Sequence, residues 1–354
     1  MPSLSLDTYD IQIAPITETL PALLEKLSYG RLFVLVDENT AGHCLPRLRE
    51  ALQDHPFHTI QIRSGERNKD IGTCQLIWQQ LMQQQAGRNA LLLNLGGGVI
   101  GDMGGFCAGT FKRGIRFVQI PTTLLSQVDA SVGGKLGIDF MQVKNSIGLF
   151  LDPQAVLIDP TFLLTLPPRE VRSGFAEIIK HSLIQDAAQW AQLQQLQQLE
   201  TADWIALIPD SVAIKKRIVE EDRLEQGLRK ALNFGHTIGH AIEGHALHTD
   251  TPLLHGEAIA IGMVCEAYLS HQLLGLGAQE LHHISRYILD IYGHYPIEER
   301  HYPAYLQLMR NDKKNEGQTI NFSLLEQIGQ ARVNQQAKEQ LIKESLDFYR
   351  QLPL

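Results

Sequence analysis

The sequence predicts an α/β domain followed by an all-α domain. Short apolar runs alternate with helical segments as far as residue 160, and strand patterns nearly vanish after Pro167. Strands separated by helices pair in parallel, with helices on both faces of the sheet. We therefore expect residues 1–170 to form the first domain and residues 171–354 the second.

Each expected element follows the apolar pattern. Apolar runs ended by glycine or polar residues predict strands at residues 31–36, 58–63, 90–95, 116–120 and 155–158. Helical spacing predicts helices at residues 41–52 and 73–85, and then at 169–185, 188–199, 208–221, 235–246, 257–274, 279–291 and 337–350. Residues 318–325 form the strand pattern of the second half. Ligands of parallel sheets bind beyond the carboxyl ends of the strands. Those ends carry small and polar residues, namely Asp37-Glu38-Asn39, Gly65-Glu66, the glycine run and Thr122-Thr123.

Composition excludes several classes of protein. The chain has 31 Lys and Arg against 39 Asp and Glu, a net charge of −8, which disfavours a general nucleic-acid surface. The sequence shows neither a signal peptide nor a membrane-spanning stretch. The cysteines, Cys44, Cys74, Cys107 and Cys265, are far apart and form no C-x-x-C motif, as is typical of reduced core thiols. We expect a cytoplasmic protein that binds neither nucleic acid nor membranes.

A glycine-rich turn follows the apolar run at residues 90–95. Gly96, Gly98 and Gly101 satisfy G-x-G-x-x-G between a predicted strand and a helix. Glycines let the backbone approach a pyrophosphate, and the N-terminus of the helix favours its charge. The acidic residue usual about 20 positions later is missing, although Asp37 could hold a ribose instead. The turn predicts a Rossmann-like dinucleotide-binding domain, and a tight turn without a ligand is the alternative.

The second half contains a histidine pair at helical spacing. His236 and His240 share one helix face, and His255 follows a loop. Imidazole is a common ligand of zinc-like ions. Thr237 stands where the H-E-x-x-H metalloprotease motif has glutamate, so that hydrolysis is excluded. Fourteen histidines make a chance pair plausible, and the residues alone leave metal binding open.

Cations in apolar or glycine-rich settings suggest an anionic substrate. They include Arg113 in FKRG, Lys135 in VGGK and Lys180 in AEIIK. Lys180 shares a helix face with Glu177, for which a surface ion pair is the alternative. Several cations without nearby acids suit a substrate carrying phosphate and carboxylate.

The chain resembles the 3-dehydroquinate synthases from about Asp37 to Gly329. The resemblance rests on ordered blocks, namely GGGVIGDMGGFCAGTFKRG, QIPTTLLSQVDASVGGKLGID, KNSIG, SGFAEIIKH, GLRKALNFGHTIGHAIE and LHGEAIAIGM. It implies a homodimer with NAD, one zinc or cobalt ion, and an active site in the cleft between a dinucleotide-binding domain and an α-helical domain. The implied reaction converts the sugar phosphate 3-deoxy-D-arabino-heptulosonate 7-phosphate into 3-dehydroquinate and phosphate in the shikimate pathway. Transient oxidation by NAD, elimination of phosphate, re-reduction and an intramolecular aldol closure are its implied steps.

The resemblance also implies roles for individual residues. The metal ligands would be Glu177, His236 and His255, which leaves His240 as a proton-transfer candidate beside Glu225. Phosphate would be held by Arg113, Lys135, Asn145 and one of Lys313 and Lys314. The substrate carboxylate and nearby hydroxyls would be held by Lys215, Arg229 and Asn233, and ring hydroxyls by Asp129, Glu177 and Lys180. Contacts to NAD would come from Asp37, Glu38, Asn39, Glu66, Lys69, Gly97, Gly98, Val99, Asp102, Thr122, Thr123, Lys144, Phe162 and Thr165.

Three alternatives stay open. Another sugar phosphate cyclase, closing sedoheptulose 7-phosphate, would lack the substrate carboxylate, so Lys215, Arg229 and Asn233 disfavour it. A metal-dependent polyol dehydrogenase would need no phosphate-binding cations. A non-enzymatic NAD-binding regulator would not need Glu177 together with His236 and His255.

Overall fold

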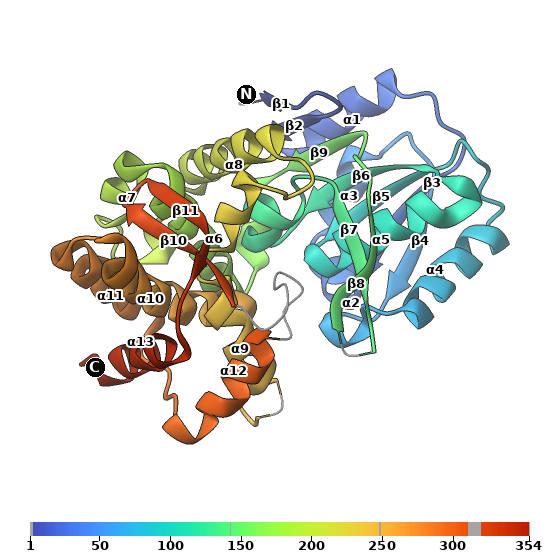
Figure 1. Cartoon of the computed structure of the whole chain (residues 1–354). Coiled ribbons are helices and arrows are strands. Elements are labelled where there is room, and N and C mark those ends of the chain that lie inside the picture. The colour runs from blue at the N-terminus through green and yellow to red at the C-terminus, as the bar shows by residue number, and fades with distance from the viewer. Residues whose placement is uncertain (1–2, 142, 248, 311–319, 354) are drawn as a thin grey trace. The chain divides into compact units, whose positions relative to one another are not determined.

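The structure is a computed structural model that describes residues 3–141, 143–247, 249–310 and 320–353 (Figure 1). The chain divides into two compact units. The first unit comprises Met1–Pro167 with Trp204–Lys216, and the second comprises Pro168–Asp203 with Arg217–Leu354. None of the helices in the described ranges combines the length and apolarity needed to cross a membrane.

A seven-stranded sheet forms the centre of the first unit, with the strand order β1-β2-β9-β6-β5-β3-β4. Its strands are β1 (Ser3–Ser5), β2 (Asp10–Ile13), β3 (Leu32–Asp37), β4 (Phe57–Ile62), β5 (Leu91–Gly96), β6 (Arg116–Pro121) and β9 (Ala155–Ile158). The short edge strand β1 pairs antiparallel with β2. All other neighbouring strands in this order, from β2 through β9, β6, β5 and β3 to β4, pair in parallel. The predicted parallel sheet is therefore confirmed.

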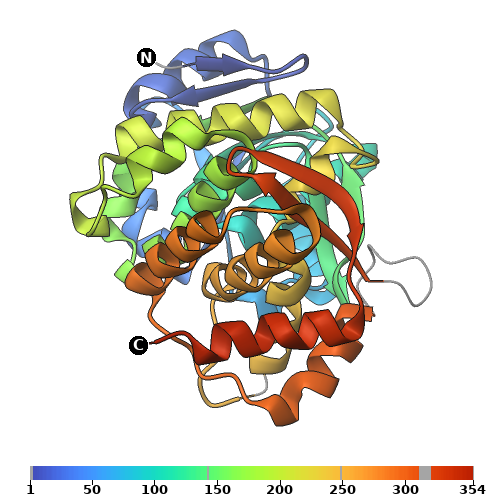
Figure 2. The same ribbon diagram turned by 60° about the vertical axis from the view of Figure 1, so that its left-hand side comes forward.

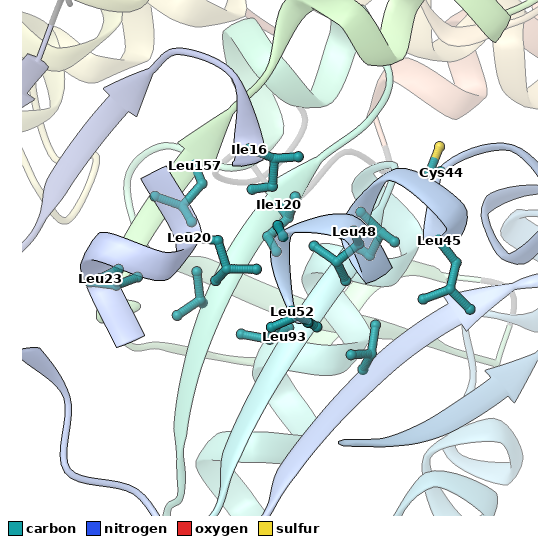
Figure 3. Packing of buried hydrophobic residues seen from close by; sticks show 14 of the residues in the cluster. Ile16, Leu20, Leu23, Cys44, Leu45, Leu48, Leu52, Leu93, Ile120 and Leu157 are labelled. Atoms are coloured by element: carbon teal, nitrogen blue, oxygen red, sulfur yellow. The ribbon is translucent and has the colours of Figure 1, made fainter. Parts of the chain in front are cut away.

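Helices cover both faces of this sheet because its strands are apolar on both sides. Alternate residues of β3 and β5 enter two separate cores. One core packs against α1 (Ile16–Lys26) and α3 (Leu45–Ala51), as Figure 3 shows for Leu20 and Leu48 above Leu93. The other packs against α4 (Ile71–Gln83) and α5 (Gly98–Thr110). Burial on both faces explains why the strand sequences are continuous apolar runs rather than alternating ones.

The first unit also contains a two-stranded ribbon, which the sequence analysis did not predict. It is formed by β7 (Lys135–Phe140) and β8 (Val143–Phe150), which pair antiparallel. Most residues of β8 are exposed, so the apolar periodicity that identifies a buried strand is missing. The remaining elements of this unit are α2 (Glu38–His43), η1 (Glu66–Asn68), η2 (Phe111–Arg113), η3 (Ser126–Ala130) and η4 (Pro160–Thr165).

The second unit is mostly helical, as predicted. Its helices are α6 (Pro168–Gln185), α7 (Ala187–Leu193), α9 (His236–Ala246), α10 (His255–Leu274), α11 (Ala278–Tyr292), α12 (Tyr302–Arg310) and α13 (Glu339–Gln351). The short helices are η5 (Leu199–Thr201), η6 (Leu228–Asn233) and η7 (Glu299–His301), and α8 (Trp204–Glu221) runs from residues of the first unit into the second. An antiparallel ribbon of β10 (Asn321–Gln327) and β11 (Gln330–Gln336) completes it.

Helix α10 is the central helix of the second unit. It packs against α6, α9, α11, α13 and β10, and Figure 2 shows α13, in dark red, running across the helices of this unit. Residues all around α10 are buried, from Gly256 to Ser270. A helix that is apolar on every side is a core helix, so α10 holds its neighbours in place.

Two predicted helices differ from the observed ones. The helix expected at residues 41–52 is broken into α2 and α3, because Pro46 lies in the first turn of α3 and has no N–H to continue α2. The helix expected at residues 188–199 ends at Leu193. There the chain turns more tightly, with the Leu193 carbonyl accepting the Leu196 N–H at 2.9 Å and the Tyr287 hydroxyl at 2.6 Å.

Candidate functional site

Three helices of the second unit bring Glu177, His236 and His255 together. Glu177 lies in the middle of α6, His236 is the first residue of α9, and His255 is the first residue of α10. Glu177 Oε1 lies 3.7 Å from Nε2 of His236 and 3.7 Å from Nε2 of His255. One carboxylate oxygen and two imidazole nitrogens therefore face one another, although they are far apart in the sequence.

Glycines allow the three helices to come this close. A Cβ at Gly256 would lie 1.8 Å from the Ser173 carbonyl oxygen of α6, and a Cβ at Gly262 would lie 1.9 Å from the Gly235 carbonyl oxygen. No side chain fits at those distances, so only glycine permits these backbone contacts. The Ser173 hydroxyl also accepts the Gly256 N–H at 3.0 Å. Gly256 directly follows His255, and Gly235 directly precedes His236, so these contacts set the positions of both histidines.

A hydrogen bond at Nδ1 orients the imidazole of His236 and that of His255. His236 Nδ1 lies 3.2 Å from the Phe234 carbonyl oxygen, and His255 Nδ1 lies 3.4 Å from Glu243 Oε2. A proton on Nδ1 that is donated to these oxygens leaves the Nε2 lone pair directed at the cluster. Histidines that bind metals in proteins are usually held in this way.

Charge is concentrated around Glu177, which is fully buried. Lys180, 1% exposed, forms a salt bridge with Glu177 Oε2, and His181 Nε2 lies 4.0 Å from the same oxygen. Burial lowers the pKa of His255, but hydrogen bonds and charge interactions with Glu177 and Glu243 outweigh it and raise the pKa to about 9. The carboxylates of Glu177 and Glu243 thus favour a cation at this cluster.

His240 lies one turn along α9 from His236, as the i, i+4 spacing predicts. Its ring centroid is 5.0 Å from that of His236 and 5.6 Å from that of His255. Nitrogen atoms of these three histidines lie within 4.8 Å of one another and could themselves hold a metal ion. The geometry is thus compatible with His240 as a ligand or as a neighbouring proton-transfer group.

The loop after α8 carries Glu225, and the following helix η6 carries two further candidates, Arg229 and Asn233. The Asn233 side-chain amide donates to Glu225 Oε1 at 2.8 Å, and Arg229 Nη1 donates to the Arg223 carbonyl at 2.6 Å. Asp222 organises the loop by accepting the N–H groups of Gln226, Gly227 and Arg229. Burial opposes the effect, but these bonds lower the pKa of Asp222. Glu225 has a φ of 60°, a conformation that is strained in non-glycine residues and is common at functional sites.

In the first unit, the glycine turn has the geometry that the sequence predicts. β5 ends at Gly96, and α5 begins at Gly98 with Gly97 as its N-cap. No side chain in the described part of the chain caps this end of α5, so its first N–H groups suit an anion. A Cβ at Gly97 would lie 3.2 Å from Thr123 Cγ2, so the turn lies close to the residues that follow β6.

Beside this turn, Lys69 connects two other predicted residues, Asp102 and Asn145. Its Nζ, 4% exposed, donates to Asp102 Oδ2 at 2.6 Å and to Asn145 Oδ1 at 2.7 Å. Burial lowers the pKa of Lys69, but Asp102, Glu66 and other acids outweigh it and raise the pKa. The amine therefore remains charged at neutral pH.

Asp129 and Lys215 form a second pair in the first unit. Lys215 Nζ donates to Asp129 Oδ1 at 2.6 Å and also to its carbonyl oxygen. Lys215 comes from α8 and Asp129 from η3, so a long stretch of chain separates the partners. The family resemblance implies different roles in substrate binding for these two residues, and in the structure they are direct partners.

Other predicted residues of the first unit lie in varied surroundings. Asp37 is the N-cap of α2 and accepts the Thr40 N–H at 2.8 Å, and Glu38 accepts from Ser64. Phe162 belongs to the hydrophobic core. Exposed positions are held by Arg113, Lys135, Asn39, Lys144 and Thr165, whereas Thr122 is buried. Arg113 and Asn145 have φ values of 69° and 49°, the same left-handed region as Glu225. Lys313 and Lys314 lie outside the described residues.

Two buried acids of the second unit, Glu243 and Glu266, were not predicted from the sequence. Glu243 contacts His255, and Glu266 accepts the N–H groups of Gly235 and Ile238. Glu243 is seven residues after His236 and so lies on the same face of α9. Glu266 ends an otherwise apolar stretch of α10, and a charged residue in such a stretch is a signal because acids are rarely fully buried.

Comparison with known proteins identifies the family. The model of the 3-dehydroquinate synthase N-terminal domain matches residues 59–173, and that of the C-terminal domain matches residues 174–315. The 3-dehydroquinate synthase of Parabacteroides distasonis is 46% identical over 337 residues, covering 94% of this chain and 95% of that protein.

The chain belongs to the 3-dehydroquinate synthase family. Among solved structures, 2-epi-5-epi-valiolone synthase from Streptomyces hygroscopicus subsp. jinggangensis 5008, with NAD+ and Zn2+ bound, has a TM-score of 0.84 and 27% identity, covering 99% of this chain and 98% of that one. A 2-deoxy-scyllo-inosose synthase complexed with carbaglucose-6-phosphate, NAD+ and Co2+ has a TM-score of 0.82 and covers 99% of both chains. At 21% identity, this second likeness shows only that the two chains share a fold.

Proposed function

We propose that this chain is a 3-dehydroquinate synthase that converts 3-deoxy-D-arabino-heptulosonate 7-phosphate into 3-dehydroquinate and phosphate, as a step of the shikimate pathway. The family membership supports the reaction. The observation that carries the proposal is the convergence of Glu177, His236 and His255 from three helices. An NAD-binding protein without a metal-dependent reaction would have no use for that cluster.

The metal site fits one Zn2+ or Co2+ ion. Ligands at about 2.1 Å around a tetrahedral ion lie about 3.4 Å apart, close to the 3.7 Å between Glu177 Oε1 and either Nε2. One carboxylate and two imidazoles leave room for substrate oxygens, as a catalytic ion requires. A bound ion would polarise the substrate hydroxyl and lower its pKa. The similar valiolone synthase contains Zn2+, which supports this choice of metal.

The glycine turn fits the pyrophosphate of NAD. Gly97 and Gly98 carry no side chain, and the N-terminus of α5 directs its dipole and N–H groups outward. Bound NAD would take a hydride from the substrate and return it later, so that no net oxidation occurs. Lys69 and Asp102 would provide polar groups in fixed positions at this site, because they form an ion pair with each other. The NAD+ in the valiolone synthase structure supports the assignment.

The remaining residues would bind and orient the substrate. We assign the substrate phosphate to the exposed residues Arg113 of η2, Lys135 of β7 and Asn145 of β8, together with one of Lys313 and Lys314. Arg229, held by the Arg223 carbonyl, and Asn233 would bind the carboxylate side with Lys215. A guanidinium suits a carboxylate because its paired N–H groups match the two oxygens.

Proton transfer is assigned to His240 and Glu225. His240 lies one turn from His236, so its imidazole would be close to groups bound at the metal site. Glu225 accepts the side-chain amide of Asn233, which holds its carboxylate in one orientation. Lys180 and Asp129 would hold ring hydroxyls, because each is already fixed by an ion pair.

Release of inorganic phosphate tests the function directly. Purified protein with NAD and Zn2+ or Co2+ should release phosphate from 3-deoxy-D-arabino-heptulosonate 7-phosphate and form 3-dehydroquinate. Sedoheptulose 7-phosphate, which lacks the carboxylate, is the matched control. Faster turnover of sedoheptulose 7-phosphate would make this chain a different sugar phosphate cyclase, and net accumulation of NADH would make it a dehydrogenase.

We further propose that the enzyme acts as a homodimer in the cytoplasm. The family resemblance supports the dimer, and the four cysteines, which are all free and buried, support a reducing compartment. Light scattering of the purified protein at several concentrations would measure the oligomeric state.

A further inference from the structure

Glu266 of α10 holds the start of α9 from outside that helix. Its side chain is fully buried, and both carboxylate oxygens accept backbone N–H groups. Oε2 accepts the Gly235 N–H at 2.7 Å, and Oε1 accepts the Ile238 N–H at 3.0 Å. These two N–H groups lie on either side of His236, the first residue of α9. One carboxylate therefore spans the backbone of a candidate metal ligand.

Helix α9 needs an external cap because its own N-cap cannot supply one. Gly235 has no side chain and has a φ of 81°, so the first turn lacks the usual Ser, Thr, Asp or Asn oxygen. The positive end of the α9 dipole also stabilises the negative charge of the Glu266 carboxylate. Gly262 lies one turn before Glu266 and touches the Gly235 carbonyl region, which brings α10 close enough for Glu266 to reach.

We propose that Glu266 is a positioning residue that fixes His236 for metal binding. Of the described side-chain clusters that could hold a metal, the one containing His236 does not include Glu266, so its effect is exerted through the backbone. His236 Nδ1 is held by the Phe234 carbonyl at the same turn. Glu266 thus fixes the main chain of His236 while Phe234 fixes its ring, and together they direct Nε2 at Glu177. This inference rests on the metal site of the proposed function.

Removal of the carboxylate should therefore weaken metal binding more than it weakens the fold. Without it, two buried N–H groups lose their acceptor, and the first turn of α9 must move to find another. Outer groups that orient metal ligands typically change metal affinity by about 10- to 100-fold. We expect Glu266→Gln, which keeps the volume and one acceptor oxygen, to lower Co2+ affinity about tenfold. Glu266→Ala should lower it about 100-fold.

The experiment measures Co2+ binding to the full chain without NAD or substrate, by competition with a chromophoric chelator. The visible absorption of bound Co2+ reports its ligand geometry, and we expect its band positions to shift in both Glu266 variants. Ser270→Ala is the matched control, because Ser270 is one turn further along α10 and its hydroxyl accepts the Leu325 N–H of β10 at 2.9 Å. That variant should lose stability while keeping the Co2+ affinity and spectrum of the unaltered protein.

Co2+ binding to both Glu266 variants that matches Ser270→Ala would overturn the inference while leaving the metal site intact. Retention of Co2+ by His236→Ala would instead overturn the metal site itself, and the inference with it. Amide hydrogen exchange of the unaltered protein gives a test that needs no variant. Because coupling is reciprocal, Co2+ should slow exchange at Gly235 and Ile238 by about tenfold or more, and unchanged exchange at both would contradict the proposal.

Discussion

The two units build their candidate sites from different parts of the chain. In the first unit, the glycine turn between β5 and α5 offers backbone N–H groups and the absence of side chains. In the second unit, the cluster consists of the side chains of Glu177, His236 and His255. Hydrogen bonds from other residues orient them, as that of Glu243 does for His255. Backbone suits a pyrophosphate, which is bound along its length, whereas a single ion needs a few donor atoms at fixed positions.

This difference predicts which substitutions each site tolerates. The second unit should be sensitive to isosteric changes that alter one donor atom. The first unit should be sensitive to side-chain volume added at its glycines and to loss of the ion pair between Lys69 and Asp102.

The largest expected effect is that of Glu177→Gln. The amide keeps the shape of the side chain but removes the negative oxygen that faces His236 and His255, so zinc affinity should fall by at least about 100-fold. Metal content after dialysis and chelator competition measure it. Glu170→Gln, on the same helix and partly exposed, is the control and should retain zinc. Full metal occupancy in Glu177→Gln would contradict the ligand assignment.

Lys69→Met tests the charged pair of the first unit. Without the amine, the half-buried Asp102 carboxylate loses its charged hydrogen-bond donor, and the free energy of unfolding should fall by about 2 kcal/mol. Adding Asp102→Asn should restore part of the loss, and urea unfolding of the two variants measures the difference. An equal loss in both variants would show that the pair is not the cause.

The same variant should depend on pH with a defined sign. Burial raises the pKa of Asp102 in the folded chain. A raised carboxyl pKa contributes stability at low pH and loses it as pH rises through the folded-state value. The loss of unfolding free energy in Lys69→Met should therefore be smaller at about pH 5 than at about pH 8. Urea unfolding at both values measures it, and a deficit that grows on acidification would contradict this reasoning.

Gly104→Ala tests the packing that supports the glycine turn. A Cβ at residue 104 would lie 2.1 Å from the buried Asn94 Oδ1, so the Asn94 side chain or the backbone of α5 must shift. The expected cost is about 1–3 kcal/mol of unfolding free energy, with weaker NAD binding. Gly42→Ala meets nothing within 4 Å and is the control, which should be neutral or slightly stabilising, by up to about 1 kcal/mol. Equal stability of the two variants would show that the contact is unimportant.

The smallest effect should be that of Arg169→Gln. Its ion pair with Glu257, at 2.7 Å, lies at the start of α10 near His255, but the arginine side chain is 50% exposed. Exposed pairs contribute less than about 1 kcal/mol, so thermal unfolding and zinc affinity should change little. Glu257→Gln should cost more, because Glu257 also accepts the Leu254 N–H at 2.8 Å. A large loss of zinc in Arg169→Gln would mean that surface pairs also fix the metal site.

The sequence predicted the elements whose burial repeats regularly. The strands β3, β5 and β6 were predicted within a residue or so of their bounds, because continuous apolar runs mark strands covered on both faces. The ribbon of β7 and β8 was missed because its residues are mostly exposed on one strand, and no apolar period reveals it. The break between α2 and α3 was also missed, although Pro46 was visible in the sequence.

By itself, the sequence determined the residue types of both sites: the glycines of the turn, the histidine pair at one helix face, and the acids and cations that the family blocks carry. The family resemblance implied that Glu177, His236 and His255 belong to one site, and the tertiary structure places them together. Only the tertiary structure decided that Lys215 pairs with Asp129 and that Glu266 caps α9. The physical reason is distance along the chain. Helical and strand periods report which neighbours in sequence share a face, whereas these contacts join residues tens of positions apart and depend on helices packing at glycines.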